Sequence, residues 1–503
     1  GTIQLRTRGV PEGFIAKVQL TGIYLDGTTG SEGLSYRGDA QDWTGFDHGR
    51  ELPGAIADRI ALDGRLRPRT SFNPGGVTPA EYEAFGEQYA ALGFDQKSES
   101  LPPGAGLAAS LGNVWEIGGA RIGFLSSLRY QNQWDTSEET RRVYRVEGTD
   151  TLVLGAELER LRSEQNIELS GFFNAGVESG ENHKLTSTSV LVRQSVDEAR
   201  FSEGYTEDPG DRSRFYQNEW IENELTTQQF RGEHIFPAAS NLTVDWQWTH
   251  ARAGRDSPAN RQYRYDQDNN SGDYLFSSRA DSNSSDYSTL EDNADEYALN
   301  LKWPWAFGED SSLTLSAGAS QLKRDRESGI LRFVYRAVGP RSRDPAVLAL
   351  PPNQLFSAAN IGPGGFQFDQ TGRDTDFYVA EQSLDAFYAS LDVVWREDWR
   401  FTLGARQEDN FQLVANGDPT QPGAEITEAR IEQRDLLPSA SVTWIRSDKD
   451  QFRLGYSETL SRPDFRELSA APFTDPLLDT ETIGNPELVA TAIRNYDLRW
   501  EYY

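Results

Sequence analysis

Histidines and carboxylate-rich runs are the features of this chain whose residue types could hold a metal. The chain has four histidines, none of them paired at the spacing of a helical zinc motif: His48, His183, His234 and His250. The run 266–273, DQDNNSGD, is similar to a calcium-binding loop, but its glycine stands one place late. Ser277 stands where such a loop requires a bidentate glutamate, and there is no cysteine to supply a thiolate. We therefore expect no metal site.

Catalytic and cofactor motifs are also missing from the sequence. There is no G-x-S-x-G elbow and no phosphate-binding G-x-x-x-x-G-K. Paired carboxylates such as Glu138-Glu139 and Glu291-Asp292 do not differ from ordinary loop charge. Acidic residues number 78 and basic residues 49, so the net charge of −29 argues against a nucleic-acid partner. We expect neither an enzyme nor a bound cofactor.

The elements of the chain are predicted by an alternation with a period of two. In the stretch 241–252, NLTVDWQWTHAR, every second residue from Leu242 to Trp248 is apolar and those between are polar. This pattern is typical of a β-strand with one apolar and one polar face. It recurs in at least five other stretches: 14–21, 122–134, 313–320, 387–395 and 438–444. No convincing period of 3.6 residues is found, so the sequence predicts an all-β protein.

The connections indicate which solvent meets the apolar faces. Short connections are expected near 118–119, 179–183, 237–240, 304–310, 397–398 and 446–450. Long polar ones alternate with them, at 26–106, 135–164, 197–213, 253–294, 327–382, 413–430 and 461–492. Outer-membrane barrels have short periplasmic turns and long external loops. Aromatic residues such as Trp303, Trp399 and Trp444 adjoin the short turns, as in a barrel girdle. We predict an antiparallel transmembrane β-barrel wall of about fourteen strands, its apolar faces in lipid.

Motifs at both ends of the chain resemble one family. Residues 2–8 read TIQLRTR, and LSRPDF (460–465) is followed by GNPEL (484–488) and NYDL (495–498). In this order the motifs resemble those of TonB-dependent outer-membrane receptors, particularly the subgroup of Xanthomonas- and Caulobacter-like bacteria. Five residues mark the family motifs: Arg462, Pro463, Gly484, Asn485 and Pro486. A proline ends a strand ladder and Asn-Pro is a turn signal, so loop architecture explains them better than ligand contact.

The resemblance implies a plugged barrel of twenty-two strands that imports a scarce nutrient. Residues 1–10 would then be the last strand of the plug domain, and 11–503 a partial barrel with long extracellular loops. About eight further strands, the rest of the plug and its energy-coupling box are expected outside this sequence. The implied partners are outer-membrane lipid and lipopolysaccharide, an extracellular small ligand and the periplasmic TonB energy-coupling complex. That complex would act through an N-terminal segment.

Aromatic residues in two long loops are the candidate ligand contacts. They are Trp43, Phe46, Tyr263, Tyr265, Tyr274 and Phe276. Their flat faces suit sugar rings and aromatic siderophores alike, whereas nine acidic residues within 266–296 would repel an anionic ferric complex. Solvated charge and simple packing explain the same residues equally well. We favour a neutral oligosaccharide over a ferric siderophore. The alternative functions are a passive porin or adhesin barrel, and a soluble sugar-binding β-protein.

Overall fold

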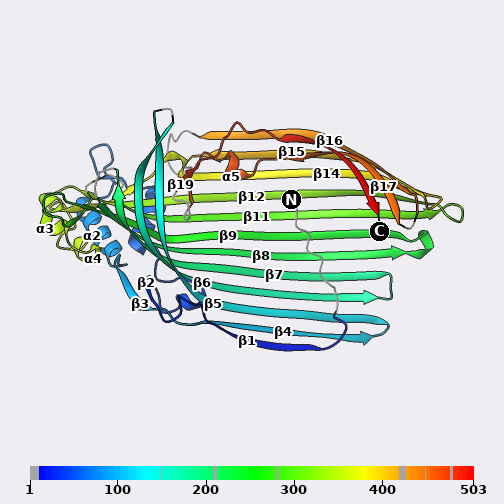
Figure 1. The fold of residues 1–503 in the computed structure, drawn as a ribbon, viewed down its shortest axis with the longest axis horizontal. Coiled ribbons are helices and arrows are strands. Elements are labelled where there is room, and N and C mark those ends of the chain that lie inside the picture. Colours follow the sequence, from blue (N-terminus) through cyan, green and yellow to red (C-terminus); the bar gives the residue numbers. More distant parts are fainter. Residues whose placement is uncertain are drawn as a thin grey trace.

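One long antiparallel sheet makes up most of the computed structural model (Figure 1). The structure describes residues 11–148, 150–207, 212–277, 279, 282–417, 426–447, 449–475 and 480–502. The expected plug strand 1–10 lies outside these residues. Fourteen strands pair in the order β1-β4-β5-β6-β7-β8-β9-β11-β12-β14-β15-β16-β17-β20, and β10 and β13 add to β9 and β12. The predicted antiparallel architecture and strand number are confirmed.

The bounds of the fourteen strands are β1 (Ile15–Ile23), β4 (Gly104–Ile117), β5 (Ala120–Glu147), β6 (Thr151–Ser179), β7 (His183–Thr206), β8 (Arg212–Phe236), β9 (Leu242–Gln267), β11 (Asn283–Ala306), β12 (Ser312–Ala337), β14 (Phe377–Trp395), β15 (Trp399–Asn416), β16 (Thr427–Ile445), β17 (Asp450–Ser461) and β20 (Thr491–Tyr502). Shorter strands are β2 (Glu32–Tyr36), β3 (Gln96–Ser100), β10 (Tyr274–Phe276), β13 (Phe366–Thr371), β18 (Phe473–Asp475) and β19 (Thr480–Thr482). The α-helices are α1 (Gly54–Asp63), α2 (Pro79–Ala90), α3 (Pro345–Leu348), α4 (Pro352–Leu355) and α5 (Phe465–Leu468). The 3-10 helices are η1 (Asp42–Thr44), η2 (Pro237–Ala239), η3 (Pro340–Arg343) and η4 (Asp374–Asp376).

The strand register gathers the apolar residues on one face of the sheet. Residues that are directly opposite in neighbouring strands share a face. Leu315 pairs with Leu391, which pairs with Leu403, and Leu403 pairs with Ala440. We call this the band face, since it carries the apolar band. The opposite, polar face carries pairs such as Ser316 with Ser390. The alternation predicted from sequence is therefore continuous across strands.

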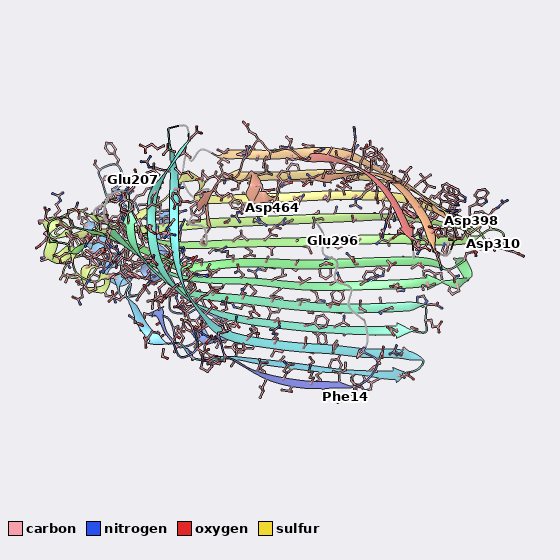
Figure 2. The ribbon with its side chains drawn as sticks, in the orientation of Figure 1. Phe14, Glu207, Glu296, Asp310, Asp398 and Asp464 are labelled. Carbon is pink, nitrogen blue, oxygen red and sulfur yellow. The ribbon has the colours of Figure 1, made fainter. Side chains whose placement is uncertain are left out.

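Aromatic side chains form a ladder at the turn end of the band face. Trp399 stacks on Trp444 at 5.7 Å between ring centroids, and Trp444 stacks on Phe452 at the same distance. Phe452 continues the ladder to Trp500 at 6.1 Å. Figure 2 shows Asp310 and Asp398 at this end and Glu207 at the opposite one. The ladder marks one boundary of the lipid band, where an indole meets both hydrocarbon and water.

The predicted boundaries of the long loops are wrong for most of the chain. Residues 135–164 were expected to be a loop, but β5 and β6 are 28 and 29 residues long and fill most of it. The strands β7, β8, β9, β11 and β12 likewise run into the segments expected to be loops. Beyond the band no face of a strand meets lipid, so nothing there requires every second residue of a paired strand to be apolar. The sequence then carries no apolar alternation to reveal it.

Two α-helices were also missed inside the segment 26–106. Helix α2 begins with a capping box, in which the Thr78 side chain accepts from the Glu81 backbone N–H and Glu81 reaches back to Thr78. Pro79 at the first helical position completes this start signal. Within the described residues, no helix has the length and apolar character to cross a membrane.

The helices α1 and α2 pack on the band face at the long-loop end of the strands, beyond the apolar band. There they bury an aromatic core with side chains from β9, β12 and β13: Tyr82, Phe85, Tyr89, Tyr263, Tyr265, Phe333, Tyr335 and Phe368. Tyr335 donates its hydroxyl to the backbone oxygen of Gly86 at 2.6 Å, tying α2 to the sheet. This core is the larger of the two clusters of buried hydrophobic side chains among the described residues, and it joins the outer ends of the strands to the helices.

A bulge in β9 lets its outer half join this core. Five residue steps, Asp256 to Arg261, lie opposite four on β8, from Glu222 to Asn218. Ala259 in the bulge has φ of 51°, in the left-handed region. The extra residue reverses the alternation of β9, so that Tyr263 points into the aromatic core on the band face.

We predict that a charge on the band face blocks assembly in the outer membrane. Leu391→Arg places a guanidinium in lipid at a cost of roughly 2–4 kcal/mol near the midplane. Ser390→Arg, one residue away on the polar face, is the matched control and should assemble. Both substitutions are made in the full natural gene. Assembly of each variant is measured as heat-modifiable migration of the protein in gels of the membrane fraction. Equal assembly of the two variants would contradict the assignment of the faces.

Candidate functional site

A cavity of about 350 Å³ opens on the polar face at the long-loop end of strands β6 to β9. The register places its side chains in two rows that cross these strands. One row runs Arg160, Ser202, Phe215, Arg264. The other row runs Arg200, Gln217, Gln262. The bulge in β9 brings Gln262 and Arg264 onto this face, because without the extra residue these even-numbered positions would point to the band face.

The arginines of the cavity are held by neighbours on the same strands. Arg264 donates from Nε to Asp266 at 2.6 Å and lies over the Phe215 ring at 5.1 Å. Arg160 donates from Nε to the Ser202 hydroxyl at 3.2 Å. Arg200 donates to the Gln217 amide oxygen at 3.2 Å and pairs with Glu198. These contacts fix the guanidinium groups at the wall of the cavity.

Glu219 lies one row further along the polar face, paired in register with Glu198. Its side chain is buried and accepts from the amide nitrogen of Asn260 at 3.1 Å. Burial, and then the nearby charge of Glu198, raise the pKa of Glu219 to about 7. Position 219 lies beyond the apolar band, so this carboxyl is outside the part of the sheet that faces lipid.

The six aromatic candidates fall into two separate places. Tyr263, Tyr265, Tyr274 and Phe276 gather in or against the aromatic core. Tyr263 is 3% exposed and stacks on Tyr216 at 4.8 Å, and its hydroxyl donates to the Phe94 oxygen. Tyr274 is only partly buried, and the guanidinium carbon of Arg214 lies 3.7 Å from the centre of its ring. The structure therefore brings four of the six together, mainly as packing.

Trp43 and Phe46 lie apart from that core, on the band face beside β5 and β7. The Trp43 ring meets Tyr130 edge-on at 6.3 Å, and Arg193 lies 4.0 Å from the centre of the Phe46 ring. Trp43 remains 59% exposed. Neither residue lines the cavity, and their part in ligand contact stays a proposal.

A buried cluster of ion pairs attaches the segment that carries Trp43 and Phe46 to the sheet. Arg50 contacts Asp42, Asp47 and Asp197 at 2.7 to 3.2 Å, and it lies 4.5 Å from the Trp220 ring. Burial raises the pKa of Asp197 to about 6 against the opposing charge of Arg50. A buried arginine with three carboxylates fixes where this segment crosses β7 and β8.

The family-motif residues hold a loop onto the polar face. Arg462 pairs with Glu408 at 2.7 Å and reaches Asp435 at 3.4 Å. The oxygen of Pro463 accepts from the Gln412 amide at 2.9 Å. Phe465, at the start of α5, is 1% exposed in a small core with Tyr378 and Val414. Figure 2 shows the neighbouring Asp464 above the middle strands of the sheet.

Asp464 adds a second anchor for the motif loop. Its carboxylate contacts Arg326 at 3.2 Å and Arg324 at 3.5 Å, and both arginines pair with Asp292. The GNP motif closes the loop from the other side, since Gly484 donates to the Ser469 oxygen and Asn485 to the Glu467 oxygen. Both motifs serve loop architecture in this structure, as expected from their residue types; Pro486 follows them in the same turn.

Sequence reasoning missed the arginines and glutamines of the cavity. Positions 160, 200 and 264 fell within segments expected to be loops, where charged residues are ordinary. Only the strand register brings them together, and register depends on hydrogen bonds between distant segments. The motif Arg462 was found because its neighbours form a recognisable local pattern.

Comparison with known proteins identifies a family and similar solved structures. Residues 171–503 match the family model described as TonB dependent receptor-like, beta-barrel. No curated protein matches the chain. The chain is similar to the crystal structure of the siderophore receptor PiuA from Acinetobacter baumannii, with 12% identity and a TM-score of 0.41. That similarity covers 79% of this chain and 53% of the receptor, so the chain spans about half of its length.

We predict that Gly484→Ala loosens the motif loop. A Cβ at position 484 would lie 2.4 to 2.6 Å from three backbone oxygens, those of Ser469, Arg466 and Glu467. Limited proteolysis should then cut 462–490 faster in the variant than in the natural protein. Gly455→Ala is the control, because its Cβ would meet only Asp497 at 3.6 Å. Unchanged cutting in the first variant would contradict the packing described.

We also predict that Glu219 makes stability fall as pH rises. A carboxyl whose folded pKa exceeds its unfolded value stabilises the fold below the unfolded pKa and loses that contribution as pH rises through the folded one. The window runs from the ordinary value of 4.5 to about 7. Denaturant unfolding in micelles should show a shallower pH slope for Glu219→Gln, with Glu233→Gln as the control. A slope that does not change would refute the assignment.

Proposed function

Because the chain belongs to the TonB dependent receptor-like β-barrel family, a family of the Gram-negative outer membrane, we propose that it forms the barrel wall of a receptor for nutrient import. Residues 11–503 supply the wall, and residues 1–10 end a plug domain. In this proposal outer-membrane lipid and lipopolysaccharide surround the band face. The TonB complex supplies the energy through an N-terminal segment, and the protein transports its ligand without reaction.

The observation that best supports an extracellular ligand is the cavity on the polar face. The short-turn end with its aromatic ladder is the periplasmic side of such barrels, so the opposite end, with the cavity, faces outward. A volume of about 350 Å³ lies within the range of small-molecule sites. Its wall includes two glutamine amides, the serines Ser202 and Ser282 and the aromatic residue Phe215, which suit a molecule with many hydroxyl groups.

We propose an oligosaccharide as the ligand of the cavity. Trp43, Phe46 and the partly buried Tyr274 lie on the band face, across the sheet from the cavity, so we propose them only as a separate surface contact. The buried Tyr263, Tyr265 and Phe276 then support the site by packing. A ferric siderophore is the second candidate, favoured by the three arginines at the cavity wall.

We predict that deleting the gene impairs growth on an oligosaccharide as sole carbon source and leaves growth under iron limitation unchanged. A cell without the receptor lacks the energised route for a scarce, slowly diffusing substrate. Growth curves across carbohydrate sources, with and without an iron chelator, test this. Complementation with the natural gene is the control. A defect confined to iron limitation would replace the oligosaccharide with a siderophore.

A further inference from the structure

We propose that the cavity between β6 and β9 recognises a carboxylate group, so that the imported ligand is acidic. This inference rests on the proposed import function, and it names the chemistry of the ligand. An oligosaccharide containing uronic acid and a carboxylate-bearing iron chelate are the two sources of such a group. We favour the acidic oligosaccharide, since the cavity wall also offers amide and hydroxyl partners.

The charge at the cavity wall is the first support. Among the described residues that line it, three are arginines and none is an aspartate or glutamate. This is unusual in a chain with 78 acidic and 49 basic residues. The acidic partners Glu139, Glu198 and Asp266 pair with the three arginines from positions outside the lining. An anionic group entering the cavity therefore meets guanidinium groups first.

The burial of these arginines is the second support. Arg160 and Arg200 are 6% and 2% exposed, and Arg264 stands on the Phe215 ring. A guanidinium recognises a carboxylate with two parallel hydrogen bonds, and fixing it beforehand lowers the entropy cost of binding. The attraction is also stronger where the surroundings exclude water.

The arrangement of the two rows is the third support. Arg264 and Arg160 stand at the two ends of one row, while Gln217 and Gln262 stand in the other. Ser202 lies between the arginines, on the strand next to Arg160. A sugar acid presents a carboxylate beside several hydroxyls, and this wall presents guanidinium groups beside amides and a hydroxyl.

The composition of segment 266–296 suggests that it would repel an acidic ligand, but the contacts of its carboxylates show otherwise. Asp266 contacts Arg264, Asp286 contacts Arg332, Glu291 contacts Arg252 and Asp292 contacts Arg324. These carboxylates are therefore balanced by nearby arginines from other parts of the sheet. Repulsion of an incoming anion is weaker than the sequence count of nine acids implies.

Binding to the full receptor in detergent micelles tests the proposal, measured by isothermal titration. The probes are an oligosaccharide of uronic acid, the neutral oligosaccharide of the same length and linkage, and a ferric complex of a carboxylate chelator. We expect the uronic oligosaccharide to bind at least tenfold more tightly than the neutral one. Arg264→Gln and Arg200→Gln should each weaken that binding about 10- to 100-fold, the loss of a hydrogen-bonded charge.

Arg252→Gln is the matched control, because Arg252 pairs with Glu291 on the band face, away from the cavity. It should leave binding unchanged, and heat-modifiable migration should confirm that every variant is folded. Equal binding of the neutral and acidic oligosaccharides would overturn the carboxylate inference and leave the oligosaccharide function standing. Binding of the ferric complex alone, lost in Arg264→Gln, would support the carboxylate site and overturn the oligosaccharide function. Arginine variants that bind as the natural protein does would overturn the site.

Discussion

The pairing of backbone N–H and C=O groups is the constraint on which this structure depends. Hydrocarbon offers these groups no partner, so strands that cross a bilayer must pair with one another in a continuous sheet. The register from β1 to β20 meets this requirement, with each strand paired antiparallel to the next long strand in sequence. Once the ladder is fixed, the alternation of side chains assigns every residue to one face. The band, the ladder of aromatic rings and the cavity all follow from that assignment.

The same constraint explains what the sequence predicted well. Between Leu313 and Ala319, or between Phe387 and Trp395, lipid on one face and water on the other enforce a period of two, so the strands and their faces can be identified. Outside the lipid this constraint on residue type no longer applies. Strand β5 continues through the segment 135–142, whose side chains are polar on both faces, and there the sequence offers only the features of a loop. Helix α2 did leave a local signal in Thr78, Pro79 and Glu81, which a search for helix starts would have found.

The motif loop and the cavity also differ in how far the sequence could predict them. The motif loop was identified because Arg462-Pro463 and Gly484-Asn485 are contiguous residues with recognisable turn chemistry. The loop is closed locally by the backbone oxygens of Glu467 and Ser469, although its packing on the polar face uses distant residues such as Glu408, Arg326 and Val414. The cavity has no such local origin. Arg160, Arg200 and Arg264 come from three strands separated by dozens of residues, and only long-range register brings them to one wall.

Because of the bulge near Ala259, the face to which each side chain in the outer half of β9 points depends on the number of residues in the strand. Tyr263 reaches the aromatic core and Arg264 the cavity because one additional residue stands between them and the lipid-spanning half of the strand. A change of residue type there alters a contact, whereas loss of a single residue exchanges the inward and outward positions of everything up to Gln267. Substitutions and deletions are therefore not comparable events in this strand. Related chains that keep both the core and the cavity must preserve the length of this segment more strictly than its composition.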